Sequence, residues 1–333
     1  MALTTYGASG VSPRTNVYAE AQMLMHTLPT VILEKTGKPY RMPKNKTAVV
    51  KFRRPVVFTA ATTPLVEGVT PTSTAFTYED VTATLGQYGM VVEITDKIED
   101  LHEDPVLNDA AEQAGENIGR TQEALNYAVT KAGTSVYYAN GALRTAVNTA
   151  ISLNKQRAVV RALKGQKAKK IRTMLSSSPN YATKAVEAAF IGVCHTDCEA
   201  DIRGLPGFTP VSQYGQVKPI CAEEFGTVED VRYLCSPDLD PFADAGGAKG
   251  SMVSTTGTSA DVYPILYFGQ EAWAHVALRG QGAISPTIIP PGQKTKDDPL
   301  GQRGVIGWKM WHTAVILNDL WMSRLEVAVT DLG

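Results

Sequence analysis

Residues 46–95 constrain the fold most, because they predict two strands whose connecting segment has nothing nearby to pack against. Within 46–58 apolar and charged residues alternate with the period of a half-buried strand. A second strand is expected within 76–95, and the intervening TAATTPLVEGVTPTSTA is rich in threonine and proline. An isolated two-stranded ribbon is at best marginally stable in water. We therefore expect this arm to pack on another body, in this chain or in another copy.

The composition is that of a globular protein without strong bulk charge. The 333 residues are 44% hydrophobic, and the net charge is −1. A protein that mainly wrapped nucleic acid would carry a clear basic excess. Residues 1–25 lack the basic start and apolar centre of a signal peptide, and no apolar run approaches the ~20 residues of a membrane span. We expect a soluble protein made in a cytoplasm, with its four cysteines reduced.

A long helix is predicted over residues 105–132. Asp104 can cap its first turn, Pro105 suits its first position, and Gly133 suits its end. Between them apolar residues recur at three- and four-residue spacing and form one face that is mostly alanine. Whatever packs on this face must therefore lie close to the helix.

The middle of the chain predicts a mixed α/β region. A helix is expected over 146–163, and apolar runs of strand length follow at 188–194, 231–235 and 262–268. Such runs are typical of strands that are buried on both faces, so they predict a central sheet. Residues 241–260 are rich in glycine and small polar residues and predict a long surface loop.

The C-terminal segment holds three of the four tryptophans, between Trp308 and Trp321. Residues 305–317 and 320–329 predict a hairpin about Asn318 and Asp319, apolar on both faces. The alanine-faced helix is the obvious cover for one face, because it can admit large indole rings. We expect a platform built from both ends of the chain, with the α/β region as an excursion from it.

Cysteine and histidine side chains offer the main candidates for chemistry. Cys194, His195 and Cys198 resemble half a zinc site, to which Cys221 or Cys235 could add ligands, but the spacing is loose. Cys194 and His195 could also act as a nucleophile and base, although sequence neighbours seldom reach that geometry. Buried cysteines at a strand end are the simpler interpretation. No HExxH, GxSxG, GxxxxGK or GxGxxG motif occurs, so we expect no enzyme, metal or cofactor.

A basic tract follows the helix expected in the middle region. Its side chains could meet the phosphates of DNA, although a solvated helix end is the commoner origin of such a tract. The tract comprises Lys164, Lys167, Lys169, Lys170 and Arg172.

The order of these elements resembles that of tailed-bacteriophage major capsid proteins of the Hong Kong 97 type, over the whole chain. Three segments look similar to phage capsid sequences: KFRRPVVF with PLVEG and Thr–Pro beyond it at 51–71, EADIRGLPGFTPV at 199–211, and DPLGQRGVIGWKMWHTAVILNDLWMSRLE at 298–326. The last is the most specific, because it is long, dense in tryptophan and free of any catalytic motif.

The resemblance implies an α+β fold with four parts. These are an N-terminal arm (1–45), an extended two-stranded loop (46–95), a peripheral domain (96–144 and 282–333) with a spine helix over 105–132, and an axial α/β domain (145–281).

The implied function is that of a major capsid protein whose copies, as hexamers and pentamers, build the icosahedral shell around a double-stranded DNA genome. Each extended loop would lie across a neighbour, with Leu65 and Val66 buried there and with Arg53, Arg54 and Glu67 selecting the register by charge. The protein would belong to the virion and assemble in the host bacterial cytoplasm.

The resemblance also implies partners. A separate scaffolding protein is expected, because only about 45 residues precede the loop, whereas the type member of the fold begins with a long helical scaffolding segment. A portal protein at one vertex, a decoration or cement protein, and packaged DNA bound non-specifically complete the expected partners. No membrane is expected.

Two other readings stay open at this point. The chain could form an encapsulin-like bacterial compartment, which would enclose enzyme cargo rather than a genome. It could also be a two-domain hydrolase that uses Cys194 and His195. A receptor-binding fibre is disfavoured by the long helix, since such proteins tend to be repeat-rich and all-β.

Overall fold

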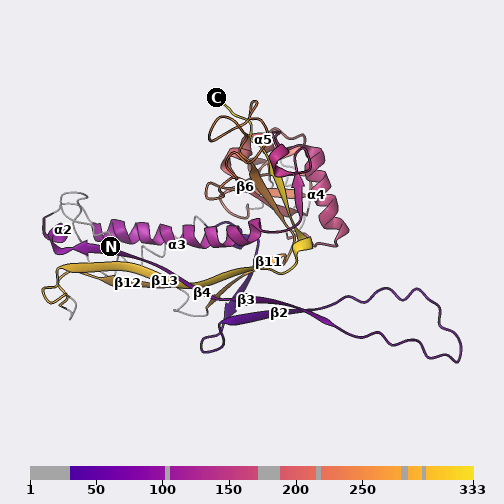
Figure 1. Cartoon of the computed structure of the whole chain (residues 1–333), viewed down its shortest axis with the longest axis horizontal. Coiled ribbons are helices and arrows are strands. Elements are labelled where there is room, and N and C mark those ends of the chain that lie inside the picture. Colours follow the sequence, from indigo (N-terminus) through magenta and orange to yellow (C-terminus); the bar gives the residue numbers. More distant parts are fainter. Residues whose placement is uncertain (1–30, 102–105, 172–187, 215–218, 279–283, 295–297) are drawn as a thin grey trace.

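Two sheets and one long helix make up the body, and a ribbon projects from it (Figure 1). The computed structural model describes residues 31–101, 106–171, 188–214, 219–278, 284–294 and 298–333. Asp104 and Pro105, expected to begin the long helix, lie outside these residues. None of the helices described is both long and apolar enough to cross a membrane.

The long helix α3 (Val106–Lys131) lies along a five-stranded sheet (Figure 1) and ends one residue before its predicted end at 132. Its alanine face is buried against the longest strand, β13 (Arg303–Ile316), where Ala114 and Ile118 share a cluster with Trp308. The predicted packing of an alanine stripe on an indole is therefore confirmed for this tryptophan. Small side chains let the helix approach the sheet closely enough to exclude water.

The five-stranded sheet combines segments from most of the chain. Its long strand β13 pairs antiparallel with β11, β12 and β4, and the N-terminal β1 pairs parallel with β11. The other four strands are β1 (Lys38–Met42), β4 (Gly86–Thr95), β11 (Trp273–Leu278) and β12 (Ile284–Ile289).

The second limb of the expected 46–95 ribbon proves to be two strands. Only β3 (Tyr78–Thr84) pairs with β2 (Val49–Pro55), whereas β4 belongs to the body and pairs with β13 over its whole length. The break falls at Leu85, which is buried beneath the ribbon and donates its N–H to the Ala48 carbonyl at 2.9 Å. The expectation of one continuous second strand was wrong, because a buried anchor divides it.

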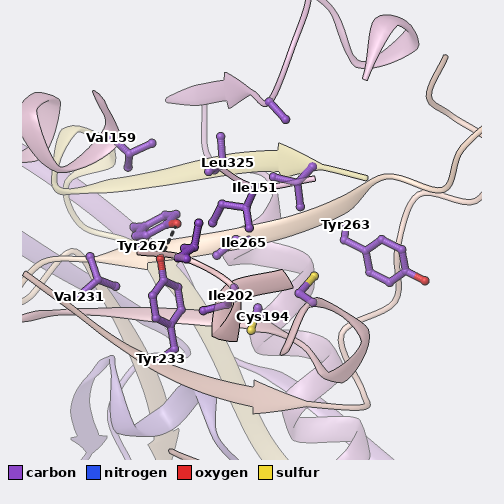
Figure 2. Packing of buried hydrophobic residues seen from close by; sticks show 14 of the residues in the cluster. Ile151, Val159, Cys194, Ile202, Val231, Tyr233, Tyr263, Ile265, Tyr267 and Leu325 are labelled. Carbon is purple, nitrogen blue, oxygen red and sulfur yellow. Dashed lines mark hydrogen bonds between the residues drawn. The ribbon is translucent and has the colours of Figure 1, made fainter. Parts of the chain in front are cut away.

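The second sheet has seven strands and holds the largest core. The three apolar runs of the middle region form its adjacent strands β10, β6 and β9, as predicted for a buried central sheet. Tyr233 and Tyr267 lie inside this core with their hydroxyls 3.0 Å apart (Figure 2). In order the strands are β5 (Val136–Tyr138), β14 (Met322–Val327), β10 (Tyr263–Phe268), β6 (Phe190–His195), β9 (Val231–Ser236), β8 (Glu224–Val228) and β7 (Phe208–Pro210).

The helix predicted over 146–163 begins later than expected, as α4 (Leu153–Gly165). Residues before it are tied to other segments: the Val147 carbonyl accepts the Gly247 N–H, and the Thr149 carbonyl accepts the Ala328 N–H. These long-range bonds replace the first helical turns. Residues 241–260 contain no helix or strand of the described fold, in agreement with the predicted loop.

The expected C-terminal hairpin does not form. After β13 the chain makes a 3-10 turn at Asp319–Trp321 and enters the other sheet, where β14 pairs antiparallel with β10 and parallel with β5. The Asp319 carboxylate accepts the Thr134 N–H at 3.1 Å, which holds this turn beside the end of α3. The tryptophan-rich segment therefore joins the two sheets.

The described part of the N-terminal arm, residues 31–45, rests on the body, whereas residues 1–30 lie outside the described residues. Its 3-10 turn Leu33–Lys35 sits on α3, where the buried Glu123 carboxyl accepts the Leu33 N–H at 3.0 and 3.2 Å. The buried carboxyl thereby satisfies a backbone donor that has left water.

Replacing Glu123 with glutamine is expected to reduce the pH dependence of stability. Burial raises the pKa of Glu123 to about 8, from an ordinary 4.5. The folded state therefore holds a proton that the unfolded chain releases, so the free energy of unfolding falls as the pH rises from 4.5 to about 8, with a limiting slope of about 1.4 kcal/mol per pH unit. Glutamine keeps an oxygen for the Leu33 N–H but does not titrate.

Urea unfolding of both proteins at about pH 5 and about pH 9 measures this effect. The glutamine variant should gain stability relative to the wild type at the higher pH. An equal difference at both pH values would contradict a neutral, buried Glu123.

Candidate assembly interface

The base of the ribbon is anchored on the body. β2 and β3 pair antiparallel from Val49 and Thr84 to Pro55 and Tyr78. One face of this pair lies against the five-stranded sheet, where its side chains share an apolar cluster with strands β1, β11 and β13. The cluster contains Met42, Val50, Phe52, Ala83, Leu85, Val276, Trp311 and Val315.

Beyond this base the ribbon leaves the body. Every residue from 55 to 80 is exposed, and the chain between β2 and β3 runs out and back without secondary structure (Figure 1). Leu65 and Val66, the predicted contact residues, are 77% and 67% exposed. The described part of the chain therefore does not bury this arm.

The tip of the arm is a turn. The Val69 N–H donates to the Val66 carbonyl at 3.2 Å, and Gly68 adopts φ +77, which glycine tolerates without steric cost. Glu67 lies between them and is the one charged residue from 55 to 78. The structure thus places Leu65, Val66 and Glu67 together, as an apolar turn with a single carboxylate.

Arg53 and Arg54 already have partners within their own ribbon. The Arg53 guanidinium donates to both Asp80 carboxylate oxygens at 2.7 and 3.0 Å, and Arg54 pairs with Glu79 at 2.6 Å. The hydrogen bond from Arg53 is the main cause that lowers the pKa of Asp80 to about 2. Cross-strand pairs of this kind hold the register of the ribbon itself.

Three exposed aromatic side chains were missed in the sequence. Phe58, Phe76 and Tyr78 form a row beyond the base of the ribbon, with ring centroids 5.8 Å apart for the first pair and 4.7 Å for the second. The available signal was the i, i+2 spacing of Phe76 and Tyr78, which places two rings on one face of a strand.

The basic tract is partly neutralised. Lys164 and Lys170 both form ion pairs with Asp230. Burial acts to raise the pKa of Asp230, but the two lysine hydrogen bonds outweigh it, so that its pKa is lowered. Lys167 and Lys169 are exposed, and Arg172 lies outside the described residues. The tract therefore presents less positive charge than its sequence suggests.

The cysteine cluster is part of a core. Cys194, on strand β6 (Figure 2), and Cys198 are buried in the core of the seven-stranded sheet, and burial raises the pKa of both thiols far above the ordinary value. His195 Nδ1 accepts the Asp197 N–H at 3.2 Å and so caps a turn. Protonated, buried thiols do not suit a nucleophile. The described ranges contain no group of three or more His, Cys, Asp or Glu side chains suited to a metal ion.

Comparisons with known proteins agree with this geometry. The model of a family described as phage capsid protein matches residues 78–324. The capsid of Ralstonia phage GP4 is 12% identical at a TM-score of 0.65, with 100% of this chain and 99% of that chain covered. The cyanophage Pam1 capsid is 13% identical at 0.60, with 98% and 97% covered.

A compartment protein shares the fold as well. The holo-SrpI encapsulin of Synechococcus elongatus is 11% identical at a TM-score of 0.51, with 100% of this chain and 99% of that chain covered. No curated protein sequence matches the chain. The likenesses to solved structures confirm the predicted α+β fold of the Hong Kong 97 type.

Proposed function

Because this chain belongs to the phage capsid protein family, it is a major capsid protein, and we propose that its copies close an icosahedral shell around the double-stranded DNA genome of a tailed phage. The observation that carries this proposal is the arm over residues 55–80, which is exposed throughout. Both sheets and the long helix are already packed, so among the described elements the arm is the one that lacks a packing partner.

In this proposal each arm lies across a neighbouring copy within hexamers and pentamers. The side chains of Leu65 and Val66 become buried against the neighbouring copy, and the Glu67 carboxylate contributes to selecting the register of that contact. Arg53 and Arg54 act mainly by stiffening the ribbon, since both are paired within it. The peripheral part would comprise most of 96–144 and 282–333, together with β1, β4 and β11, which share the five-stranded sheet. The axial part would comprise most of 145–281, together with β5 and β14, which share the seven-stranded sheet.

Further partners follow from the same role. We expect a separate scaffolding protein during assembly in the host cytoplasm, a portal protein at one vertex, and a decoration or cement protein on the finished virion. Packaged DNA would meet Lys167 and Lys169 non-specifically, because these two lysines are exposed, whereas Lys164 and Lys170 pair with Asp230.

An encapsulin-like compartment is the second candidate, favoured by the shared fold of the Synechococcus protein. Its shell would enclose enzyme cargo, so the nature of the contents separates the two functions. A Cys194 hydrolase gains no support from a buried, protonated thiol.

Sedimentation and negative-stain microscopy of the expressed chain, alone and with a phage scaffolding protein, test the proposed function. We expect closed particles of uniform size. A chain that stays monomeric under every assembly condition would contradict the proposal, and particles loaded with enzyme would favour the compartment.

A further inference from the structure

We propose that the ring cluster, defined as Phe58, Phe76 and Tyr78, anchors the arm on a second copy of this chain. This inference rests on the proposed function and names the part of the arm that carries the contact. It moves the main anchor from the tip, where Leu65 and Val66 lie, to the segment between the tip and the paired strands.

The strand register separates two faces of the ribbon. Side chains of directly opposed residues share a face, and faces alternate along each strand. Val50 and its partner Ala83 pack toward the body, whereas Pro55 and its partner Tyr78 lie on the opposite face. The Tyr78 ring therefore faces away from the apolar cluster that anchors the ribbon.

The ring cluster is exposed, and its rings pack on one another. Its rings are 53–54% exposed, although aromatic side chains of this size are ordinarily buried. Phe76 meets Tyr78 edge-on at an interplanar angle of 80°. Contiguous exposed apolar patches are typical of interaction sites.

Arg53 holds one end of the cluster in place. Its guanidinium lies 5.3 Å from the centroid of the Tyr78 ring, and both Asp80 oxygens fix that guanidinium. A side chain that is already ordered loses little conformational freedom on binding, so the rings can contribute more of their buried area to affinity. Arg53 thus positions an anchor rather than contacting the neighbour by charge.

The partner that fits is another copy of this chain rather than DNA. The chain between β2 and β3 extends away from its own body (Figure 1), and members of the family build capsids from many copies. The charges of the ribbon balance, because the three cations within 51–80 (Lys51, Arg53 and Arg54) are matched by three carboxylates (Glu67, Glu79 and Asp80), and all three cations form ion pairs there. That leaves an apolar surface without the free positive charge that phosphates would require.

Alanine substitutions in the full chain test this assignment. We expect Phe76→Ala and Tyr78→Ala each to raise the critical concentration for shell formation about 30-fold, as truncation of an aromatic hot spot does. Tyr78→Phe keeps the ring and should assemble like the wild type. Leu65→Ala and Val66→Ala are the matched tip variants and should change the critical concentration by less than about fivefold.

Because all these positions are exposed, far-UV circular dichroism and melting temperature should match the wild type. The ring inference would be overturned if both ring variants assembled like the wild type while the tip variants lost assembly. In that case the arm would still contact the neighbouring copy, but through its tip. If ring variants, tip variants and an arm deletion all assembled normally, the arm's role would fall as well.

A photo-crosslinking residue at position 76 gives a second readout that does not depend on affinity. In assembled shells it should join two copies of the chain, and in dispersed subunits it should not. Adducts confined to the same chain in assembled shells would overturn the inference.

Discussion

Deletion of residues 59–74 is expected to leave a folded, soluble subunit that no longer forms shells. Every deleted residue is exposed, so neither sheet loses a packing partner, and the contact between α3 and β13 is unchanged. Between subunits the loss is large: about 1,000 Å² of apolar burial is worth roughly 25 kcal/mol before ordering costs, and the net is far smaller. A shell contains hundreds of such contacts, so the small net free energies of the single contacts add up to a large total.

The deletion also disturbs the ring cluster, since it joins Phe58 through Ala75 to Phe76 and leaves no room for the observed ring packing. A matched control replaces residues 59–74 with a glycine–serine segment of equal length, which restores the reach of the arm without its apolar tip. Circular dichroism and melting temperature report the fold, and sedimentation reports assembly. Normal shells from the deletion variant would refute the role of the arm.

Trp308→Ala is expected to cost about 3–5 kcal/mol of unfolding free energy, the largest effect of a single substitution that we predict. The indole is 4% exposed and fills the seam between β13 and the alanine face of α3, beside Ala111, Ala114 and Ile118. Its Nε1–H has no hydrogen-bond partner among the described residues, so the loss is one of packing. A cavity would remain, because the helix backbone cannot collapse far onto the sheet.

Chemical denaturation of dispersed subunits measures this loss. Leu320→Ala is the control, because Leu320 is exposed and its truncation should change stability by less than about 0.5 kcal/mol. Ala114→Leu probes the same seam from the other side and should cost about 1–3 kcal/mol through overpacking. A Trp308→Ala variant as stable as the Leu320 control would mean that α3 does not pack on β13 as described.

Local sequence patterns predicted the parts of the fold that local physics decides. The period of α3 lies within its own residues, and so does the apolar run of each central strand, so both could be recognised without knowledge of their partners. The alanine face even indicated the indole rings of the C-terminal segment as its partners, because a stripe of small residues can admit large ones.

Pairings between distant segments could not be read in the same way. Residues 320–329 are apolar on both faces, which suits a hairpin with β13 as well as the observed place between β5 and β10. The turn at Asn318 is compatible with either outcome. The choice depends on β10, more than fifty residues earlier in the chain, so nothing in the local sequence decides it.

In the candidate interface, too, features within one short segment could be predicted, whereas features that depend on pairing between segments could not. Leu65, Val66 and Glu67 could be assigned to an exposed tip because they lie in one short segment without strand pattern. The roles of Arg53 and Tyr78 depend on the register between β2 and β3, which a long connection does not specify. The exposed ring cluster became visible only once that register was known.

The most direct test of the account is a cryo-electron microscopy map of assembled particles. We predict density for residues 55–80 of each copy on the surface of an adjacent copy, with Phe58, Phe76 and Tyr78 buried in that contact. An arm folded back onto its own body, or one that extends into solvent without touching a neighbour, would contradict the account.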